Sequence, residues 1–356
     1  MRFILILLTL MVVCAQPFAA GMAQAADPEI EKYQNIILTA INKGKSEKIS
    51  LDKKLSAMAS ELSATKSNPG TALANKNGVY DMQFELVNIQ LSDPDLLSKQ
   101  NFYSSIRSSN YVGIDITKQD DLYHVTIIGV KRYVVLSDIK PAITTDTVTI
   151  HGKWVDANSK PANIVVIAPD GGDTTYQIDE MNAKNEFAVP IKTISAGKYM
   201  VEINGKSNKG PLSAATVLLF RDTQPEYTYE SADSSDNSIE YWLSLINRER
   251  NKSGLPPLTL SKRLSQIAQA HSMDMGEHDF VAHVSPTTGD VLDRIKGISY
   301  TRVGENIAMG NSVAVIHNGL MDSPAHRKNI LGDYTSIGLG LYKKGDSYYA
   351  TQVFIK

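Results

Sequence analysis

An internal repeat constrains the fold of this 356-residue chain more than any other feature of its sequence. Three blocks recur in the same order, and the matched pairs are residues 50–59 with 259–268, 88–89 with 306–307, and 112–126 with 337–351. The offset between matched blocks only grows along the chain, as small deletions in the first copy would produce. Such recurrence is typical of a repeated structural unit. The pattern predicts that residues 30–136 are a second, shorter copy of the C-terminal fold. Chance similarity is the alternative, because each block alone is short.

The first 25 residues have the organisation of a secretory signal peptide. Arg2 supplies a positive charge, residues 3–13 form an apolar run, and residues 23–25 (AQA) give the small-x-small cleavage pattern. A membrane-spanning helix needs about 20 apolar residues, so an uncleaved anchor is the less favoured alternative. We expect an exported protein, secreted or periplasmic, with no transmembrane span after cleavage.

Cys14 is the only cysteine, and cleavage of the signal would remove it. The mature chain then has no disulfide, so packed cores must hold each domain. Hydrophobic residues make up 42% of the chain, which is enough for such cores. Export without disulfides fits a bacterial protein. The 36 basic and 38 acidic residues give a net charge of −2, so no excess of positive charge favours nucleic acid as a partner.

Residues 145–222 have the pattern of a small, immunoglobulin-like β-sandwich. Apolar residues alternate with polar ones at Phe187, Val189 and Ile191, and residues 170–172 (DGG) mark a turn. Short strands separated by such turns are typical of a β-sandwich. No catalytic motif occurs in this segment, so we expect a spacer or a binding module.

Residues 223–237 are polar and acidic without an apolar period, and they predict a linker. The domain that follows, residues 238–356, begins with Ile239, Trp242 and Ile246 at helical spacing and ends in alternating strand-like segments. This mixture predicts an α+β fold in which helices pack on a sheet.

Histidines are concentrated in the last domain, since five of the seven lie after residue 270. His283, His326 and Glu305 are the residues there best suited to a polar site. Two imidazoles and one carboxylate are the smallest set that holds a divalent metal ion with an open position, and zinc is the favoured ion. Without metal, Glu305 would act as a base through a neighbouring imidazole. The structural alternative is that Glu305 and Asn306 bond backbone groups of their own loop.

The other histidines of this domain have simpler interpretations. His271 shares a helical face with Leu264 and Met275, so we expect a core or cleft-wall position. His278 and His317 are expected at solvated helix positions. No serine-nucleophile elbow, phosphate loop or His-Glu-x-x-His motif occurs in the chain.

Several short segments of the last domain occur in an order that points to one family. They are residues 245–250 (LINRER), 258–260 (LTL), 304–307 (GENI), 323–327 (SPAHR) and 352–354 (QVF). On these segments, residues 239–354 resemble the CAP superfamily (cysteine-rich secretory, antigen and pathogenesis-related proteins) in its bacterial SCP-like form. The resemblance implies an α-β-α sandwich with an open cleft that holds two histidines and acidic residues. It places His283, Glu305, Asn306, Ser323 and His326 in that cleft.

The sequence departs from the family pattern at points that affect mechanism more than fold. Animal members have a second glutamate on the helix before the last histidine motif, where Ser323 stands in this chain. Their last histidine belongs to a different motif, so His326 is a bacterial counterpart. The tryptophan usual before this segment is Leu320.

The predicted first copy lacks the residues of this cluster. By the matched blocks, Val87 stands where Glu305 stands, and Asn101 falls near the position of His326. No histidine occurs between residues 27 and 123. We therefore expect an inactive copy with a structural or binding role.

These observations leave three functions open. The first is an exported binding module whose C-terminal cleft takes a metal ion or a cell-wall, lipid or protein ligand outside the cytoplasm. The second is a metal-assisted hydrolase of peptidase or esterase type that uses His283, Glu305 and His326. The third is a structural envelope protein with no active cleft. We favour the binding module over an enzyme because the resemblance implies diverse extracellular binding roles and no single reaction.

Overall fold

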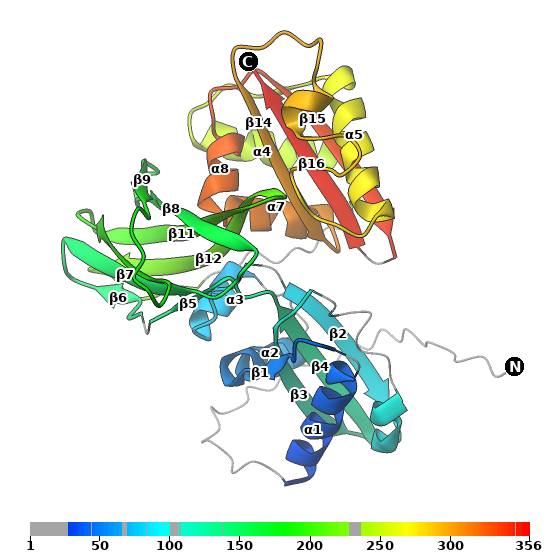
Figure 1. The fold of residues 1–356 in the computed structure, drawn as a ribbon. Coiled ribbons are helices and arrows are strands. Elements are labelled where there is room, and N and C mark those ends of the chain that lie inside the picture. Colours follow the sequence, from blue (N-terminus) through cyan, green and yellow to red (C-terminus); the bar gives the residue numbers. More distant parts are fainter. Residues whose placement is uncertain are drawn as a thin grey trace, which may run out of the picture.

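A computed structural model describes residues 28–43, 45–65, 70–82, 84–99, 106, 108–137, 139–227, 236–345 and 347–356. The predicted signal peptide and Asn101 lie outside these ranges, and so does part of the predicted linker. No helix within them is both long and apolar enough to cross a membrane. An N-terminal α+β domain, a central β domain and a C-terminal α+β domain follow one another from blue through green to red (Figure 1).

The N-terminal domain is a four-stranded sheet with helices on both faces. Its elements are α1 (Pro28–Asn42), β1 (Ser50–Leu51), α2 (Lys53–Thr65), α3 (Thr71–Lys76), β2 (Phe84–Leu91), the 3₁₀ helix η1 (Pro94–Lys99), β3 (Tyr111–Gln119) and β4 (Leu122–Val130). The strand order is β1-β3-β4-β2, with β1 parallel to β3 and the other neighbours antiparallel. One face packs against Ile37 and Ile41 of α1, and the other against Leu55 and Met58 of α2.

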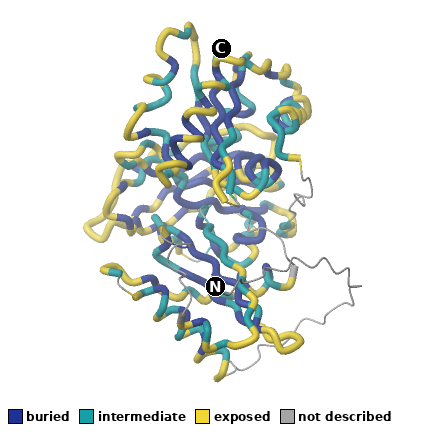
Figure 2. Tube along the Cα trace, turned by 90° about the vertical axis from the view of Figure 1, so that its right-hand side faces the viewer, coloured by how far each residue is buried: buried dark blue, intermediate teal, exposed yellow. Residues whose placement is uncertain are grey.

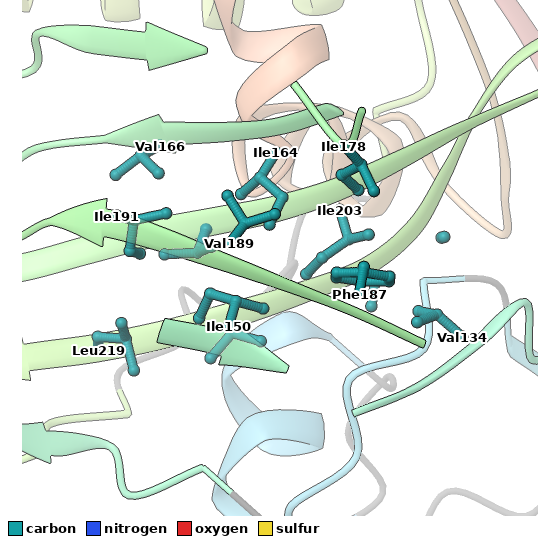
Figure 3. Close-up of a cluster of buried hydrophobic side chains, with 14 of the residues drawn as sticks. Val134, Ile150, Ile164, Val166, Ile178, Phe187, Val189, Ile191, Ile203 and Leu219 are labelled. Carbon is teal, nitrogen blue, oxygen red and sulfur yellow. The ribbon is translucent and has the colours of Figure 1, made fainter. Parts of the chain in front are cut away.

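The central domain consists of two sheets that face each other across an apolar core (Figure 3). Its elements are β5 (Val134–Leu136), β6 (Ala142–Ile143), β7 (Thr147–Trp154), β8 (Ser159–Ile167), β9 (Asp173–Gln177), β10 (Glu186–Lys192), β11 (Gly197–Ser207) and β12 (Gly210–Arg221). The strand orders are β10-β7-β5 and β6-β12-β11-β8-β9. Ile150 and Ile191 of the first sheet meet Ile164 and Leu219 of the second. Both sheets include strands that begin before residue 145.

The C-terminal domain is again a four-stranded sheet between helices. Its elements are α4 (Ile239–Lys252), β13 (Thr259–Leu260), α5 (Lys262–Glu277), α6 (Val291–Arg294), β14 (Val303–Gly310), α7 (Val313–Met321), α8 (Pro324–Ile330), β15 (Ser336–Lys344) and β16 (Ser347–Ile355). The strand order is β13-β15-β16-β14. Leu264 and Ala268 of α5 cover one face, and Trp242 of α4 and Ile316 of α7 cover the other. The predicted mixed α+β fold class is confirmed, and Figure 2 shows the buried segments in the interior of each domain.

Helix starts in the C-terminal domain follow the capping residues of the sequence. Ser238 accepts a hydrogen bond from the backbone N–H of Tyr241, and Ser261 accepts one from that of Leu264. Ser323 also stands at an N-cap, but its side chain makes no capping bond to α8. Its hydroxyl group is therefore available to another partner.

In both α+β domains a helix crosses a strand so closely that only glycine fits. A Cβ atom on Gly113 of β3 would lie 2.1 Å from the backbone of Leu55 in α2. A Cβ atom on Gly338 of β15 would lie 2.2 Å from the backbone of Leu264 in α5. Any side chain here would push the helix off the sheet.

The same two domains also share hydrogen bonds at matching places. A serine of the crossing helix accepts a hydrogen bond from a strand N–H in each domain, Ser56 from Ile114 and Ser265 from Leu339. An asparagine of the first helix also bonds the backbone in each domain, Asn42 at Ile49 and Asn247 at Leu258. Each asparagine both donates to and accepts from its partner residue, which fixes the chain that leads into the short first strand.

The two domains differ in the elements that lie between their second and third strands. Between β2 and β3, the described residues contain only η1, whereas α7 and α8 lie between β14 and β15. The helices that carry part of the candidate site thus have no counterpart in the described part of the N-terminal domain.

Both α+β domains dock on the five-stranded sheet of the central domain. Asn75 of α3 donates to the carbonyl of Thr216 and accepts from the N–H of Leu218, at 2.9 and 2.7 Å. In the C-terminal domain, α8 contacts β8 and β11 of the same sheet. The central domain therefore bridges its two neighbours.

Candidate functional site

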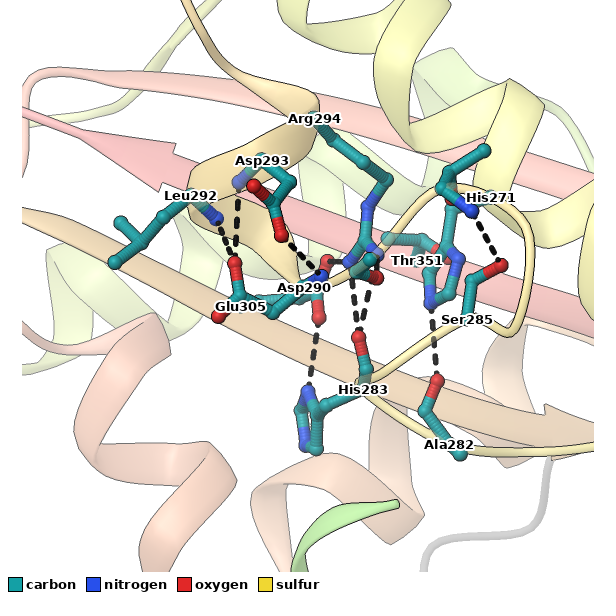
Figure 4. A network of polar contacts seen from close by, with 12 residues as sticks. His271, Ala282, His283, Ser285, Asp290, Leu292, Asp293, Arg294, Glu305 and Thr351 are labelled. Carbon is teal, nitrogen blue, oxygen red and sulfur yellow. Dashed lines mark hydrogen bonds and ion pairs between the residues drawn. The ribbon is translucent and has the colours of Figure 1, made fainter. Parts of the chain in front are cut away.

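The carboxylate of Glu305 on β14 lies between an imidazole and a guanidinium (Figure 4). His283, in the loop between α5 and α6, has Nδ1 2.9 Å from Oε1 of Glu305. Arg294 of α6 donates to Oε2 at 2.5 Å. The side chains of Glu305 and Arg294 are 2% and 5% exposed, whereas that of His283 is 20% exposed. His283 is thus the accessible member of a buried polar group.

Arg294 holds this group together, although the sequence interpretation did not single it out. Its guanidinium also donates to the carbonyls of His283 and Gly289, at 3.2 and 2.6 Å. The helix α6 that presents it begins with a capping box between Asp290 and Asp293. That capping pattern, followed by an arginine, was the available signal in the sequence.

The charge of Glu305 is stabilised despite its burial. Burial alone would raise the pKa of this carboxyl group, but the hydrogen bond from His283 and the charge of Arg294 outweigh it and hold the pKa below its usual value. The carboxylate is therefore ionised and neutralised by Arg294, which makes it a weak base.

His326 of α8 forms the second imidazole of the site. Its Nδ1 lies 2.6 Å from Oγ of Ser323. Burial lowers the pKa of His326 to about 3, with a smaller effect from His283. The ring is therefore neutral at physiological pH, and it offers hydrogen bonds rather than charge.

Asn306 and Ser323 are buried behind the imidazoles, with 0% and 1% exposed. The amide of Asn306 donates to the carbonyl of His326 at 3.0 Å and to Gln352 at 2.9 Å, and it accepts from Asn329 at 2.8 Å. These contacts tie β14 to α8, so Asn306 supports the site from inside the domain.

The central domain contributes a carboxylate that the sequence interpretation missed. Glu202 of β11 accepts hydrogen bonds from the hydroxyl of Ser323 and, at 2.8 Å, from the backbone N–H of Ala325. Its side chain is fully buried. A single charged residue within the apolar strand segment 199–203 (YMVEI) was the signal that would have found it.

The same domain also touches the loop that carries His283. The backbone N–H of Val284 donates to the carbonyl of Lys209, at 3.2 Å, in the turn between β11 and β12. Gly210 packs closely against His283, since a Cβ atom added to the glycine would lie 3.1 Å from Cβ of the histidine. The two histidines are therefore both within reach of one neighbouring domain.

The remaining histidines of the last domain divide between core and surface. His271 is 1% exposed, with Nε2 3.1 Å from the carbonyl of Ala282, which confirms the predicted core position. His278 has 57% of its side chain exposed, as expected. The prediction that His317 is solvated is wrong, because it is 1% exposed. The helix α7 packs against both α4 and β14, so most of its surface is covered.

The predicted metal ligands His283, Glu305 and His326 do not form a ready metal site. Both oxygens of Glu305 are engaged, one by His283 and the other by Arg294. A guanidinium on the carboxylate repels a divalent cation from the same oxygens. Across the described ranges, no group of three or more His, Cys, Asp or Glu side chains is arranged to hold a metal ion. The donor set of His283, Glu305 and His326 therefore does not fit zinc as it stands.

Comparison with other proteins identifies the domain that carries the polar cluster. Residues 243–354 match the family model described as CAP, the cysteine-rich secretory protein family. Residues 243–354 form a CAP domain. The matched residues contain His283, Glu305 and His326.

Relatives of the CAP domain occur in Bacillus. The uncharacterized protein YkwD of Bacillus subtilis (strain 168) is 42% identical over 133 residues, which are 36% of this chain and 51%, about half, of YkwD. The uncharacterized membrane protein YlbC of the same strain is 28% identical over 247 residues, or 60% of this chain and 70% of YlbC. A solved structure of an extracellular protein containing an SCP domain, from Bacillus anthracis str. Ames, has 21% identity and a TM-score of 0.31, covering 58% of this chain and 82% of that chain.

Proposed function

We propose that this chain is an exported CAP protein whose C-terminal cleft binds a cell-envelope ligand, of cell-wall, lipid or protein origin. The observation that carries this proposal is the polar cluster of His283, Glu305, Arg294 and His326. A fold needs no such cluster for stability, because buried ion pairs contribute little compared with apolar packing. The partial exposure of His283 gives a ligand access to it.

The charges of the cluster indicate the kind of group it would bind. Glu305 and Arg294 neutralise each other, and the low pKa of about 3 leaves His326 uncharged. A neutral imidazole such as that of His326 donates and accepts hydrogen bonds, so hydroxyl, amide and ester groups are suitable partners. Strong anions and cations find no unpaired opposite charge in this group of four side chains.

Two features favour binding over hydrolysis. The lowered pKa of Glu305 makes it a poor general base near neutral pH. Metal-assisted hydrolysis would require Glu305 to release Arg294 before it could act as a ligand. The hydrolase that uses His283, Glu305 and His326 is therefore the second candidate.

We also propose that the N-terminal domain is a second, CAP-like copy without the cluster. Support comes from the shared strand order, the close-packed Gly113 and Gly338, and the repeated serine and asparagine bonds. In the N-terminal sheet, Leu86 and Gly113 pair with the same residue of the central strand β4. In the C-terminal sheet, Glu305 and Gly338 likewise pair with one residue of β16. The apolar position is thus Leu86, one residue before the Val87 indicated by the sequence blocks.

Binding is tested with the full mature chain and two defined probes, purified peptidoglycan sacculi and phospholipid vesicles. We expect co-sedimentation with one probe, lost in His283→Ala and kept in His151→Ala, whose histidine is exposed on the central domain. Equal binding by His283→Ala and the parent chain would contradict the proposal that the C-terminal cleft is the binding site. Binding to neither probe would favour the structural envelope protein or a protein ligand.

Metal content separates the second candidate from the first. The protein is purified without chelator or affinity tag, beside the His283→Ala/His326→Ala variant. We expect no bound divalent ion in either, even after addition of zinc. About one ion in the parent and none in the variant would favour the hydrolase.

A further inference from the structure

Glu202 is an unusual residue for the outer face of a β-sheet, because its carboxylate is completely buried. Four neutral groups hydrogen-bond it: the hydroxyls of Ser323 and Ser213, the amide of Asn204 and the backbone N–H of Ala325. Burial raises the pKa of Glu202, and these donors partly offset that effect. Burial of a carboxylate costs free energy unless hydrogen bonds compensate for it, and the four donors provide those bonds.

Glu202 takes over the capping of a helix in another domain. Ser323 is the N-cap residue of α8, but its hydroxyl makes no capping bond to the helix backbone and donates to Glu202. Glu202 in turn accepts from the N–H of Ala325, which the serine would otherwise cap. The first turn of α8, with His326 on it, is thus fixed from the central domain.

The hydroxyl of Ser323 has a single proton, and this determines the state of His326. When that proton is donated to Glu202, the serine oxygen has only lone pairs to offer Nδ1 of His326. Nδ1 must then carry the imidazole proton, which leaves Nε2 as a hydrogen-bond acceptor. A group at position 202 that donates to Ser323 would reverse the bond between residue 202 and Ser323 and the bond between Ser323 and His326, while the bond from the N–H of Ala325 would keep its direction.

We propose that the central domain completes the ligand site of the CAP domain, with Glu202 acting through Ser323 as the positioning residue that sets the tautomer of His326. This inference deepens the proposed function, because it concerns the same cleft. The contact of Lys209 and Gly210 with the His283 loop supports it independently. Both cleft histidines are thereby held by one domain outside the CAP fold.

The tautomer of His326 is measured by imidazole ¹⁵N NMR on the full mature chain, with Glu202→Gln as the test variant. The glutamine oxygen can still accept from Ala325, so its NH₂ group faces Ser323 and donates to it. Ser323 must then donate to Nδ1. At pH 8 we expect the Nδ1–H tautomer in the parent chain and the Nε2–H tautomer in Glu202→Gln.

Control variants separate this relay from a general effect of mutation. Glu180→Gln changes an exposed carboxylate of the same domain and should leave the tautomer unchanged. Ser323→Ala removes the relay, so adding Glu202→Gln to it should produce no further change at His326. If Glu202→Gln does not fold, Ser323→Ala alone is compared with the parent chain, and we expect it to lose the preference of His326 for the Nδ1–H tautomer.

The same tautomer in the parent and in Glu202→Gln would overturn the inference, as would an equal effect of Glu202→Gln in the Ser323→Ala background. The readout needs no ligand. A changed tautomer with unchanged sedimentation on sacculi or vesicles would therefore keep the relay and reject the binding function at this cleft. An unchanged tautomer, with binding that is still lost in His283→Ala, would reject the relay and keep the binding function.

Discussion

The N-terminal and C-terminal domains have the same strand order, but at one equivalent position of the sheet their side chains differ greatly in polarity. Where the C-terminal sheet places the ionised Glu305 with Arg294 and His283, the N-terminal sheet has Leu86. The helices α7 and α8 are also present only in the C-terminal domain, among the described residues. The comparison teaches that the two domains share a sheet crossed closely by one helix, α2 or α5, whereas the polar cluster lies in the C-terminal domain.

The largest expected difference between the two domains is in their loss of stability at low pH. Burial lowers the pKa of His271 and His317 to about 4 and that of His326 to about 3, against 6.5 for an ordinary histidine. Unfolding therefore takes up protons, and each ring costs about 1.4 kcal/mol of stability per pH unit below 6.5. Stability is full above pH 6.5 and falls from there toward pH 4.

The N-terminal domain contains one histidine in its described residues, the partly buried His124. We expect amide exchange, corrected for its intrinsic pH dependence, to show the C-terminal domain opening at pH 5 while the N-terminal domain stays protected. Replacement of the exposed His278 by alanine should not alter this order. Parallel loss of protection in both domains would refute the assignment.

Removal of Arg294 is the next largest effect. Arg294→Met leaves Glu305 buried without its cation, which we expect to destabilise the C-terminal domain by about 3–5 kcal/mol. The double variant Arg294→Met/Glu305→Leu makes the site resemble the N-terminal domain at Leu86, and it should recover most of that loss. Calorimetric unfolding measures both. A double variant no more stable than the single one would show that the C-terminal domain needs the cluster for its stability.

Alanine at the two close-packed glycines should have equal effects. Gly113→Ala and Gly338→Ala each force a Cβ atom into a helix backbone, at a cost of about 3 kcal/mol in their own domain. Gly319→Ala, which has no atom within 4 Å of its new Cβ, is the control and should not destabilise. Exchange measured domain by domain reads each variant. A large effect at only one of the two glycines would break the structural equivalence.

The two asparagines give the smallest effect. Asn42→Ala and Asn247→Ala each remove a donor and an acceptor that bond the backbone of Ile49 or Leu258, and we expect a loss of about 1–2 kcal/mol for each. Denaturant unfolding compares them with Asn251→Ala, an exposed control. Unequal losses at Asn42 and Asn247 would limit the equivalence to the sheets.

The sequence allowed the local features to be predicted better than the long-range ones. The polar residues His283 and Glu305 follow from short motifs, and serine, a common N-cap residue, begins α4 at Ser238 and α5 at Ser261. Arg294 and Glu202 escaped because their roles depend on partners far along the chain. His317 was misplaced because its helix is covered on more than one side, which a single amphipathic face does not reveal.

The central claim is that only the C-terminal domain binds a ligand, at its two cleft histidines. Imidazole NMR signals of the full mature chain test it directly during titration with soluble peptidoglycan fragments and, separately, with phospholipid micelles. We predict that one probe shifts the signals of His283 and His326 while that of His124 in the N-terminal domain stays constant. Unchanged signals of His283 and His326 at saturating concentrations of both probes, or an equal shift of His124, would contradict the account.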